Sequence, residues 1–377
     1  FSDNVPIEDE LRLKKMAAQR GLLCMGPDCG AAYINGAGLA FYNVVDRGRV
    51  GCVAASGTGL QAVACRLDDI GEGISQGIGV GGRDLSAEIG GLMTFAALDM
   101  LAGDPATEVI VVISKPPAPE IAAQLDERLA NLGKPCVVCY VGSETRIQGD
   151  TIWVGTLDGA ANAAKSLLEG LAWHDVPFTD IAGVRTRLKR RREAGDPAGG
   201  GIHAYYTGGT LAHEAHAILR PLLGPIQNNL GYEAPGEAPG GPHLILDLGD
   251  DTYTVGRPHP MIDPAVRIDA MRAETESALP CVVLIDLVLG RGTHANPAGP
   301  IALEIERMTQ RARSEGRELV TVAAVIGTAA DPQNLADQIE LLENVGAEVF
   351  RTNAEAVRFA ALLVRPESEV VLLGGGE

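Results

Sequence analysis

The stretch "RVGCVAASGTGLQAVACRL" (residues 49–67) decides the fold of this chain. Its first part is an apolar run that ends at Ala55, and a helical pattern begins at Leu60. Between them lies a turn of small residues, made of Ser56, Gly57, Thr58 and Gly59. A strand that passes through such a turn into a helix is typical of a parallel α/β sheet. The start of the helix offers backbone N–H groups to an anion, although simple capping by Ser56 or Thr58 also explains the turn.

The same alternation of strand and helix continues along most of the chain. In the first half the pattern predicts a strand and a turn at 21–29, a strand at 49–55, a strand running into a loop at 73–82, a strand with a Pro-rich exit at 108–119 and a strand at 135–141. It predicts helices at 8–20, 59–70, 86–102 and 119–132. After a break it predicts a strand–turn–helix unit at 202–219, strands at 243–249, 281–290, 319–327 and 346–352, and helices at 264–278, 300–315, 333–345 and 354–364. The strands are continuously apolar, so both faces of each sheet are expected to be covered. The fold class is therefore α/β, with two parallel-sheet domains joined by a linker.

Composition and charge restrict the partners of the chain. The net charge of −18 and the pI near 4.8 disfavour nucleic acid, because phosphate binding needs clustered Lys and Arg. No apolar run reaches the ~18–20 residues of a membrane span, and no signal peptide is visible. The seven cysteines, an odd number within apolar segments, indicate reduced thiols. We therefore expect a cytoplasmic protein without a membrane partner. Because the sequence starts with Phe1, we also expect it to be a fragment.

Two short motifs receive structural interpretations. Cys136 and Cys139 form a C-x-x-C on an apolar strand, where positions i and i+3 face opposite sides, so buried small side chains are favoured over a shared metal. The basic run "RTRLKRRRE" (185–193) lies beside the Gly/Pro-rich segment that we take as a domain boundary. It is interpreted as a solvated linker or helix end, with an anion or partner contact as the alternative.

Two further segments have the form of an anion site. A second turn, made of Thr207, Gly208, Gly209 and Thr210, repeats the arrangement at 56–59. The segment "LGRGTHANPAGP" (289–300), with Gly290 and Gly292, follows a central strand and precedes a helix. In open α/β sheets ligands bind at the carboxyl ends of the strands, and helix starts that face one cleft add their dipoles. Whether the two domains share one anion site is left open.

Cationic side chains near these turns are candidates for charge stabilisation. Arg83, in "GVGGRD" (79–84), suits an oxyanion or carboxylate ligand, with an ion pair to neighbouring acids as the alternative. Lys115 lies at the exit of the strand at 108–114, where a Lys is either exposed or functional.

The histidines give a second group of candidates. His294, in the loop after the strand at 281–290, is the preferred acid/base residue. His259 lies between two prolines near Asp263, in a segment that either grips a ligand or forms a structural turn. His213 and His216 stand at i,i+3 without the H-E-x-x-H spacing, so no metal site is expected.

Longer motifs resemble a known family over nearly the whole chain. The sequence is similar to FdrA proteins in these stretches, which occur in order: "FSDNVPIEDELRLKKMAAQRGLLCMGPDCG", "GCVAASGTGLQAVACRL", "GIGVGGRDLSAEIGG", "VIVVISKPPAPE", "RPHPMIDP" and "VVLIDLVLGRGTHANPAGP". FdrA proteins in turn resemble succinyl-CoA synthetase and the NDP-forming acyl-CoA synthetases. The resemblance implies two flavodoxin-like, succinyl-CoA-synthetase-like domains. These are an alpha ligase-like domain at 1–168, a linker at 169–200 and a beta C-terminal-like domain at 201–377.

The resemblance also implies roles for residues. It implies that both domains meet around an anion, with the turns at 56–59 and 207–210 and the loop at 289–296 holding phosphate. Gly26-Pro27-Asp28-Cys29 resembles the Gly-Pro-Asn-Cys turn of the synthetases. The residues expected to contact the substrate are Asp28, Cys29, Asp84, His259 and Asp263.

Departures from the synthetases shape the functional hypothesis. The synthetases pass phosphate through a histidine, whereas residues 140–160 contain none, and Lys115 replaces an acid that would orient it. The upstream CoA-binding domain is not recognised in this chain. A phosphohistidine relay and thioester formation are therefore expected to be lost, and CoA and nucleotide are not expected to bind this chain alone.

The leading hypothesis is a subunit of a hetero-oligomeric carbamoyltransferase of the FdrA type. It would use carbamoyl phosphate, or another acyl phosphate, with oxamate or a similar small acceptor in purine and allantoin breakdown. Its catalytic residues would be Arg83, Lys115 and His294. The enzymatic alternative is an NDP-forming acyl-CoA synthetase. The non-enzymatic alternative is an anion-binding regulatory or scaffold subunit. A homo- or hetero-oligomer is expected in each case.

Overall fold

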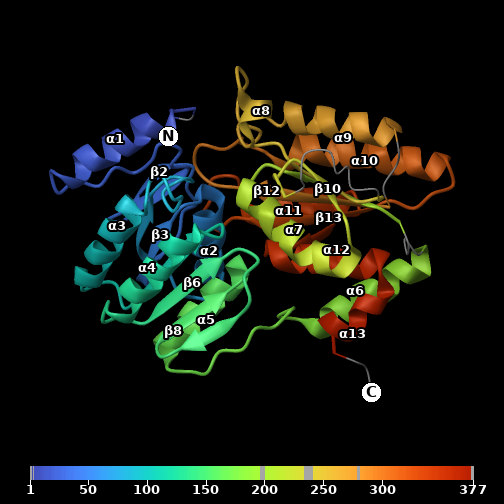
Figure 1. Cartoon of the computed structure of the whole chain (residues 1–377). Helices are drawn as coiled ribbons and strands as arrows, with labels where there is room; N and C mark the ends of the chain where they lie inside the picture. The colour runs from blue at the N-terminus through green and yellow to red at the C-terminus, as the bar shows by residue number, and fades with distance from the viewer. Residues whose placement is uncertain (1, 3, 196–199, 233–240, 278–280, 375–377) are drawn as a thin grey trace. The chain divides into compact units, whose positions relative to one another are not determined.

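The computed structural model describes residues 2, 4–195, 200–232, 241–277 and 281–374. They form two compact units: the first contains Phe1–Asp175 together with Gly290–Gly292, and the second contains Val176–Leu289 and Thr293–Glu377. Each unit is a mostly or wholly parallel sheet covered by helices, so the predicted α/β class with two sheet domains is confirmed (Figure 1). Among the described residues, no helix combines the length and the apolar character that a membrane crossing requires.

The first unit contains an eight-stranded sheet in the order β2-β1-β4-β3-β5-β6-β8-β7. Its strands are β1 (Ala31–Ile34), β2 (Ala37–Ala40), β3 (Arg47–Ala54), β4 (Ile74–Gly79), β5 (Val109–Ser114), β6 (Cys136–Tyr140), β7 (Arg146–Gln148) and β8 (Thr151–Val154). Its helices are α1 (Ile7–Ala18), α2 (Gly57–Asp69), α3 (Leu92–Gly103), α4 (Pro119–Ala130) and α5 (Leu157–Glu169). The five parallel strands in the order β4-β3-β5-β6-β8 follow the flavodoxin-like 2-1-3-4-5 pattern.

Helices cover both faces of this sheet, as its apolar strands require. Helices α2 and α5 pack against each other on one face, and α3 packs with α1 and α4 on the other (Figure 1). The strands β5 and β6 and the last five residues of β3 are buried, which accounts for their continuous apolar sequence. Cys136 and Cys139 lie fully buried on β6, as the sequence predicted.

The second unit contains a six-stranded parallel sheet in the order β10-β11-β9-β12-β13-β14. Its strands are β9 (Ile202–Tyr206), β10 (Gln227–Asn228), β11 (Leu244–Asp247), β12 (Val282–Val288), β13 (Val320–Ile326) and β14 (Glu348–Phe350). Its helical elements are α6 (Ile181–Ala194), α7 (Gly209–Leu223), α8 (Asp251–Thr254), α9 (Ala265–Ser277), α10 (Ala298–Ser314), α11 (Leu335–Asn344), α12 (Asn353–Val364), η1 (Pro366–Ser368) and α13 (Glu369–Leu372). The order β11-β9-β12-β13-β14 repeats the flavodoxin-like pattern of the first unit.

Three predicted elements of the chain differ from the structure. Residues 21–29 contain no strand. The first strand is β1 instead, which pairs with β4 and forms a hairpin with β2 through the turn Asn35-Gly36. The helix predicted at 86–102 begins only at Leu92, because Gly90 and Gly91 take positive φ values of 74° and 72°. The linker expected at 169–200 contains α6, which belongs to the second unit because its arginines reach Glu348 of β14.

Candidate functional site

The carboxyl edge of the first sheet, between β3 and β5, is where the order of the strands reverses. Ala54 pairs with Gly79 on one side and with Ile113 on the other. Just beyond, the N–H of Ala55 donates to Ile113 O at 2.9 Å, and the N–H of Val80 donates to Ala54 O at 2.9 Å. The connections after β3 and β5 therefore start side by side and lead to helices on opposite faces. Open α/β sheets bind ligands at such a switch point.

Helix α2 starts at this switch point. The N-cap Ser56 accepts the N–H of Gly59 on its Oγ at 2.9 Å, and its carbonyl accepts the N–H of Leu60 at 3.1 Å. Within the described part of the chain, no acceptor contacts the N–H groups of Gly57 and Thr58. The first turn of α2 thus presents two N–H groups at the positive end of the helix dipole, which is the arrangement that binds an anion.

The turn at 26–30 packs directly against this helix start. A Cβ at Gly57 would lie 2.9 Å from the Cα of Gly30, so two glycines allow the backbones to touch. Asp28 has a positive φ of 56° and is exposed, and its Oδ2 would lie 3.4 Å from a Cβ at Gly82. Asp28 is therefore placed at the switch point, where the sequence predicted a substrate contact.

Cys29 has a structural position instead. Its side chain is buried, and its Sγ lies 3.5 Å from the carbonyl oxygen of Ala31. Burial raises the pKa of the thiol, which keeps it protonated near neutral pH. The prediction that Cys29 binds substrate is corrected accordingly.

Arg83 and Asp84 belong to a charge network that holds α1. Arg83 contacts Glu10 Oε2 at 2.8 Å and donates to the carbonyl of Val5 at 2.7 Å. Lys14, which is fully buried, contacts Glu10 at 2.8 Å and Asp84 at 2.7 Å. Two cations and two carboxylates therefore balance one another inside the unit.

Asp84 also fixes the first turn of α3. Its carboxylate accepts the N–H groups of Met93 and Thr94 at 3.3 and 2.8 Å, and it is 0% exposed. The prediction that Asp84 contacts substrate is corrected, because its oxygens are used within the fold. The ion-pair alternative for Arg83 is the one that the structure shows.

Lys115 lies where the sequence placed it. It follows Ser114 at the carboxyl end of β5 and is exposed. Because β5 pairs with β3, Lys115 follows the strand beside the one that leads into α2. Lys115 therefore lies in the connection after β5, at the carboxyl edge of the sheet.

At the corresponding turn of the second unit, residues 207–210, a carboxylate of the protein itself accepts backbone N–H groups. Asp286, from the centre of β12, accepts the N–H groups of Thr207 and Gly208 at 2.9 and 2.8 Å. Arg267, 3% exposed, contacts Asp286 Oδ1 at 3.0 Å. A Cβ at Gly209 would lie 2.5 Å from Asp247 Oδ2, so a second carboxylate lies beside the turn.

The predicted role of Gly208 in phosphate binding is corrected for this reason. Asp286 already takes the place of an anion at Gly208, and Asp247 would repel a phosphate near Gly209. Thr210 lies buried in the first turn of α7. Gly290 and Gly292 cluster with the first unit, and their positive φ values of 115° and 86° explain why glycine occupies both positions.

His259 and His294 each accept a hydrogen bond from a backbone N–H of their own loop. His259 Nδ1 accepts the N–H of Met261 at 3.2 Å, and His294 Nδ1 accepts the N–H of Asn296 at 3.1 Å. Burial lowers the pKa of His259, so its imidazole is neutral near pH 7 with the proton on Nε2. Asp263 accepts the N–H of Ala265 at 3.0 Å at the start of α9.

These contacts support the structural-turn interpretation of the segment around His259 and Asp263. For His294 they leave only Nε2 for proton transfer.

Sequence patterns alone do not identify most of the residues that organise both units. Asp286 is a lone carboxylate inside the apolar run "CVVLIDLVLG" (281–290), and a buried acid of this kind must find partners. That signal could have identified it. Lys14 and Glu10 look like ordinary members of an amphipathic helix, and Arg267 carries no distinguishing pattern.

Comparison with known proteins adds family relationships to this geometry. Residues 205–363 match the CoA-ligase family model, and residues 45–141 match the CoA binding domain model. The second match overturns the expectation that this chain contains no region similar to a CoA-binding domain. It places the candidate site at α2 within the matched residues.

Two individual relatives are similar in sequence to the chain. The chain is 42% identical to the uncharacterized protein YahF of Escherichia coli K12 over 356 residues, covering 92% of this chain and 68% of YahF. It is 25% identical to the alpha subunit of the ADP-forming succinate–CoA ligase of Methanothermobacter thermautotrophicus over 202 residues. That match covers 50% of this chain and 66% of the subunit, so the chain spans about two thirds of these relatives' lengths.

A solved structure is matched over most of the chain. It is the dinucleotide-forming acetyl-coenzyme A synthetase 1 of Ca. Korarchaeum cryptofilum in complex with phosphate and ADP, with 14% identity, 97% of this chain and 75% of that chain covered, and a TM-score of 0.32. The strand order of each sheet, and not this score, defines the fold. By its identity to YahF the chain belongs to the YahF family, and two of its segments match the CoA-ligase and CoA binding domain models.

Proposed function

We propose that the start of α2 binds the phosphate of an acyl phosphate and that the chain is an FdrA-like subunit of a carbamoyltransferase. One observation carries the proposal: within the described residues, the N–H groups of Gly57 and Thr58 contact no acceptor. In the second turn, Asp286 takes the N–H groups of Thr207 and of the N-cap residue Gly208, just before the first turn of α7. Because two internal carboxylates, Asp286 and Asp247, lie at the second turn, we assign the external anion to the first turn.

The charges around α2 favour a substrate phosphate over a phosphoenzyme. Residues 140–160 contain no histidine, and His174 lies beyond the end of α5, which runs back toward the opposite edge of the sheet. Lys115 lies exposed at the carboxyl edge and adds positive charge that attracts phosphate. These features suit direct binding of a small acyl phosphate, of which carbamoyl phosphate is the smallest that we consider.

The proposed reaction needs positioning and charge neutralisation. The nitrogen of the acceptor, oxamate or a similar amide, forms a bond to the carbonyl carbon of carbamoyl phosphate. The bond from that carbon to the phosphate oxygen breaks, inorganic phosphate leaves, and the acceptor nitrogen releases one proton. N–H groups and a lysine that hold the phosphate stabilise the charge on this leaving group. The acceptor and the partner subunits of a hetero-oligomeric enzyme belong to the proposal.

An NDP-forming acyl-CoA synthetase is the second candidate function. It is favoured by the match of residues 45–141 to the CoA binding domain and by the similarity to succinate–CoA ligase. In that case α2 would hold a phosphate that passes between an acyl group and a nucleotide, with CoA as the acceptor. A histidine for the relay would have to come from outside residues 140–160.

One set of assays separates the two candidates. The chain is purified with its co-purifying subunits, and phosphate release is measured from carbamoyl phosphate with and without oxamate, and from ATP with CoA and a carboxylate such as succinate. The carbamoyltransferase proposal predicts release from carbamoyl phosphate that depends on the acceptor and needs neither CoA nor nucleotide. Release from ATP that requires both CoA and the carboxylate would favour the ligase. Phosphate binding without turnover in any assay would contradict both and leave a regulatory subunit.

A further inference from the structure

Helix α6 carries more positively charged side chains than the carboxylates that it contacts within the fold can neutralise. Six of the eight residues at 185–192 are Arg or Lys. Arg187, Arg190 and Arg191 surround the single carboxylate of Glu348, which is 2% exposed. Arg187 and Arg191 also donate to carbonyl oxygens at 2.9 and 2.6 Å beside β14, so they cover the open edge of this strand. One carboxylate neutralises one of these three guanidinium groups, and an excess of positive charge remains.

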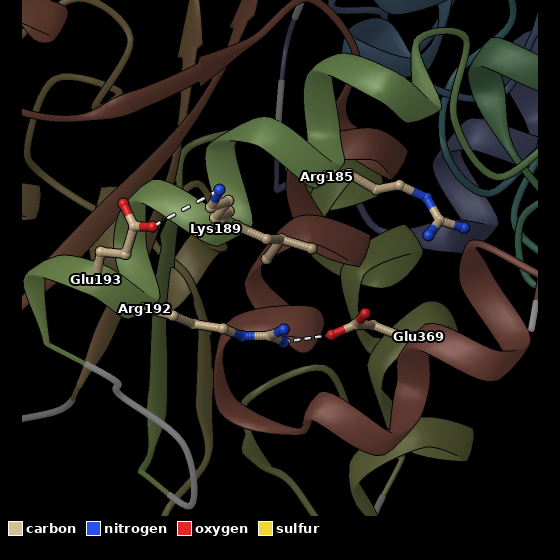
Figure 2. Close-up of a pocket in the computed structure, with 6 residues that line it drawn as sticks. Arg185, Lys189, Arg192, Glu193 and Glu369 are labelled. Carbon is tan, nitrogen blue, oxygen red and sulfur yellow. Dashed lines mark hydrogen bonds and ion pairs between the residues drawn. The ribbon is translucent and has the colours of Figure 1, made fainter. Parts of the chain in front are cut away.

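The outer side of α6 presents further cations. Figure 2 shows Arg185, Lys189 and Arg192 around a cavity of 400 Å³, with Arg192 directed to Glu369 of α13. Lys189 contacts Glu193 at 3.9 Å, and its side chain is 79% exposed. Arg185 is also exposed, and the side chain of Arg190 is 64% exposed. We call Arg185, Lys189 and Arg190 the α6 basic row.

Helix α11 presents the opposite charge. Asp337, Glu340 and Glu343 are exposed at i, i+3 and i+6, and together they span about 9 Å of helix. Among the described residues, none of these carboxylates has an ion-pair partner. Like charges at this spacing destabilise a helix when nothing compensates them. We call these three residues the α11 acidic row.

The two rows meet at one member of each, on the same unit. Glu343 of the α11 acidic row and Arg190 of the α6 basic row line one cavity of about 410 Å³ together with Arg187 and Arg191. The cavity therefore lies between the end of α11 and the middle of α6. Exposed apolar side chains flank the rows: Leu341 on α11 is 36% exposed, and Val370 and Val371 on α13 are each 69% exposed.

We propose that this surface joins two copies of the chain, with the α6 basic row of each copy against the α11 acidic row of the other. A two-fold interface uses the same patch on both copies, so it must contain both members of each contact. A basic row beside an acidic row meets that requirement. At a net charge of −18, two copies repel at long range, so local charge complementarity has to orient them.

Charge-swapped variants of the full chain test this interface by sedimentation velocity. We expect the wild-type chain to sediment with twice its mass of 39.3 kDa. Arg185→Glu/Lys189→Glu and Asp337→Lys/Glu340→Lys should each associate about tenfold more weakly or worse, because like charges meet at both contacts. An equimolar mixture of the two variants should restore the dimer, because every contact is then complementary.

The matched control reverses two cations in the first unit. Lys15→Glu/Arg20→Glu changes the net charge as much as the α6 variant and should keep the dimer. The α11 variant is expected to fold, because the carboxylates that it replaces have no ion-pair partner within the described residues. A loss of the dimer in this variant therefore reports on the interface. A monomeric wild-type chain, dimeric variants, or a mixture that stays monomeric would each overturn the proposal. None of these outcomes bears on phosphate binding at α2.

Discussion

The carboxylate of Asp286 accepts the N–H of Gly208 at 2.8 Å, across the carboxyl edge of the second sheet. The same carboxylate accepts the N–H of Thr207 and contacts Arg267. An internal anion with its own counter-ion thus binds the two residues that precede α7, in the turn that, from sequence, resembles the one at 56–59. The difference between the two turns comes from residues outside both of them.

Replacing Asp286 should destabilise the second unit strongly. In Asp286→Ala the buried guanidinium of Arg267 loses its ion pair, and two N–H groups lose their acceptor. Removing one member of a buried pair costs about 3–5 kcal/mol, and urea unfolding measures the loss. Asp263→Ala, which removes an exposed helix cap, should cost only about 1 kcal/mol. Equal losses for the two variants would contradict this role of Asp286.

The buried lysine of α1 allows a second stability test. Lys14→Met leaves Glu10 and Asp84 buried without their shared cation, so the free energy of unfolding should fall by about 3–5 kcal/mol. The neighbouring Lys15 is exposed, and Lys15→Met should change stability by less than about 0.5 kcal/mol. If Lys14→Met unfolds in the same urea concentration as wild type, the charge network does not hold α1.

His203 predicts a pH dependence of stability. Burial, with a contribution from the charge of His243, lowers the pKa of His203 in the folded chain to about 4, against 6.5 for the free side chain. Between these values the unfolded chain binds a proton that the folded chain does not, so stability falls as the pH decreases from 6.5 to 4. The loss approaches roughly 3 kcal/mol, because one pKa unit corresponds to about 1.4 kcal/mol.

Urea unfolding at several pH values measures this effect. His203→Gln should flatten the decline in stability between pH 6.5 and 4. His174→Gln, which removes an exposed imidazole, should leave the decline unchanged. An unaltered profile in His203→Gln would show that other groups cause it.

The contact between Gly57 and Gly30 should not tolerate a side chain. A Cβ at Gly57 would lie 2.9 Å from the Cα of Gly30, and backbone cannot yield as a flexible side chain does. Gly57→Ala should therefore cost about 1–3 kcal/mol and shift the turn at 26–30 away from α2. Gly103→Ala, in α3 with no atom within 4 Å of its Cβ, should be neutral or slightly stabilising. Thermal unfolding of both variants measures these effects, and equal melting temperatures for Gly57→Ala and the wild-type chain would contradict the prediction.

The periodicity of the sequence predicted most of the fold because the central strands are short, apolar and separated by amphipathic helices. The strand β3, the helix α2 and the strands β12 and β13 lie close to their predicted ranges. The hairpin β1–β2 was missed although Asn35-Gly36 is a strong turn signal. Helix α6 was read as linker because its charge reflects its partners at β14 and α13, which lie more than 150 residues away in sequence.

The candidate site was predicted less completely than the fold. The start of α2 and the position of Lys115 follow from local pattern, because a turn after a parallel strand lies at the carboxyl edge of the sheet. The occupied state of the second turn does not, since Asp286 and Arg267 are distant in sequence from Gly208. Likewise, Asp84 looks available in sequence, and only the packing of α1 shows that Lys14 takes it.

Binding of phosphate to two variants at one position tests the central claim most directly. Thr58→Pro removes one of the two open N–H groups at a first-turn position where proline is tolerated, and Thr58→Ala keeps that N–H. Calorimetric titration with inorganic phosphate and with carbamoyl phosphate should show similar affinities for wild type and Thr58→Ala. It should show a loss of about tenfold or more in Thr58→Pro, as expected for one charge-assisted hydrogen bond. Undiminished phosphate binding by a folded Thr58→Pro variant, or no binding by wild type, would contradict the account.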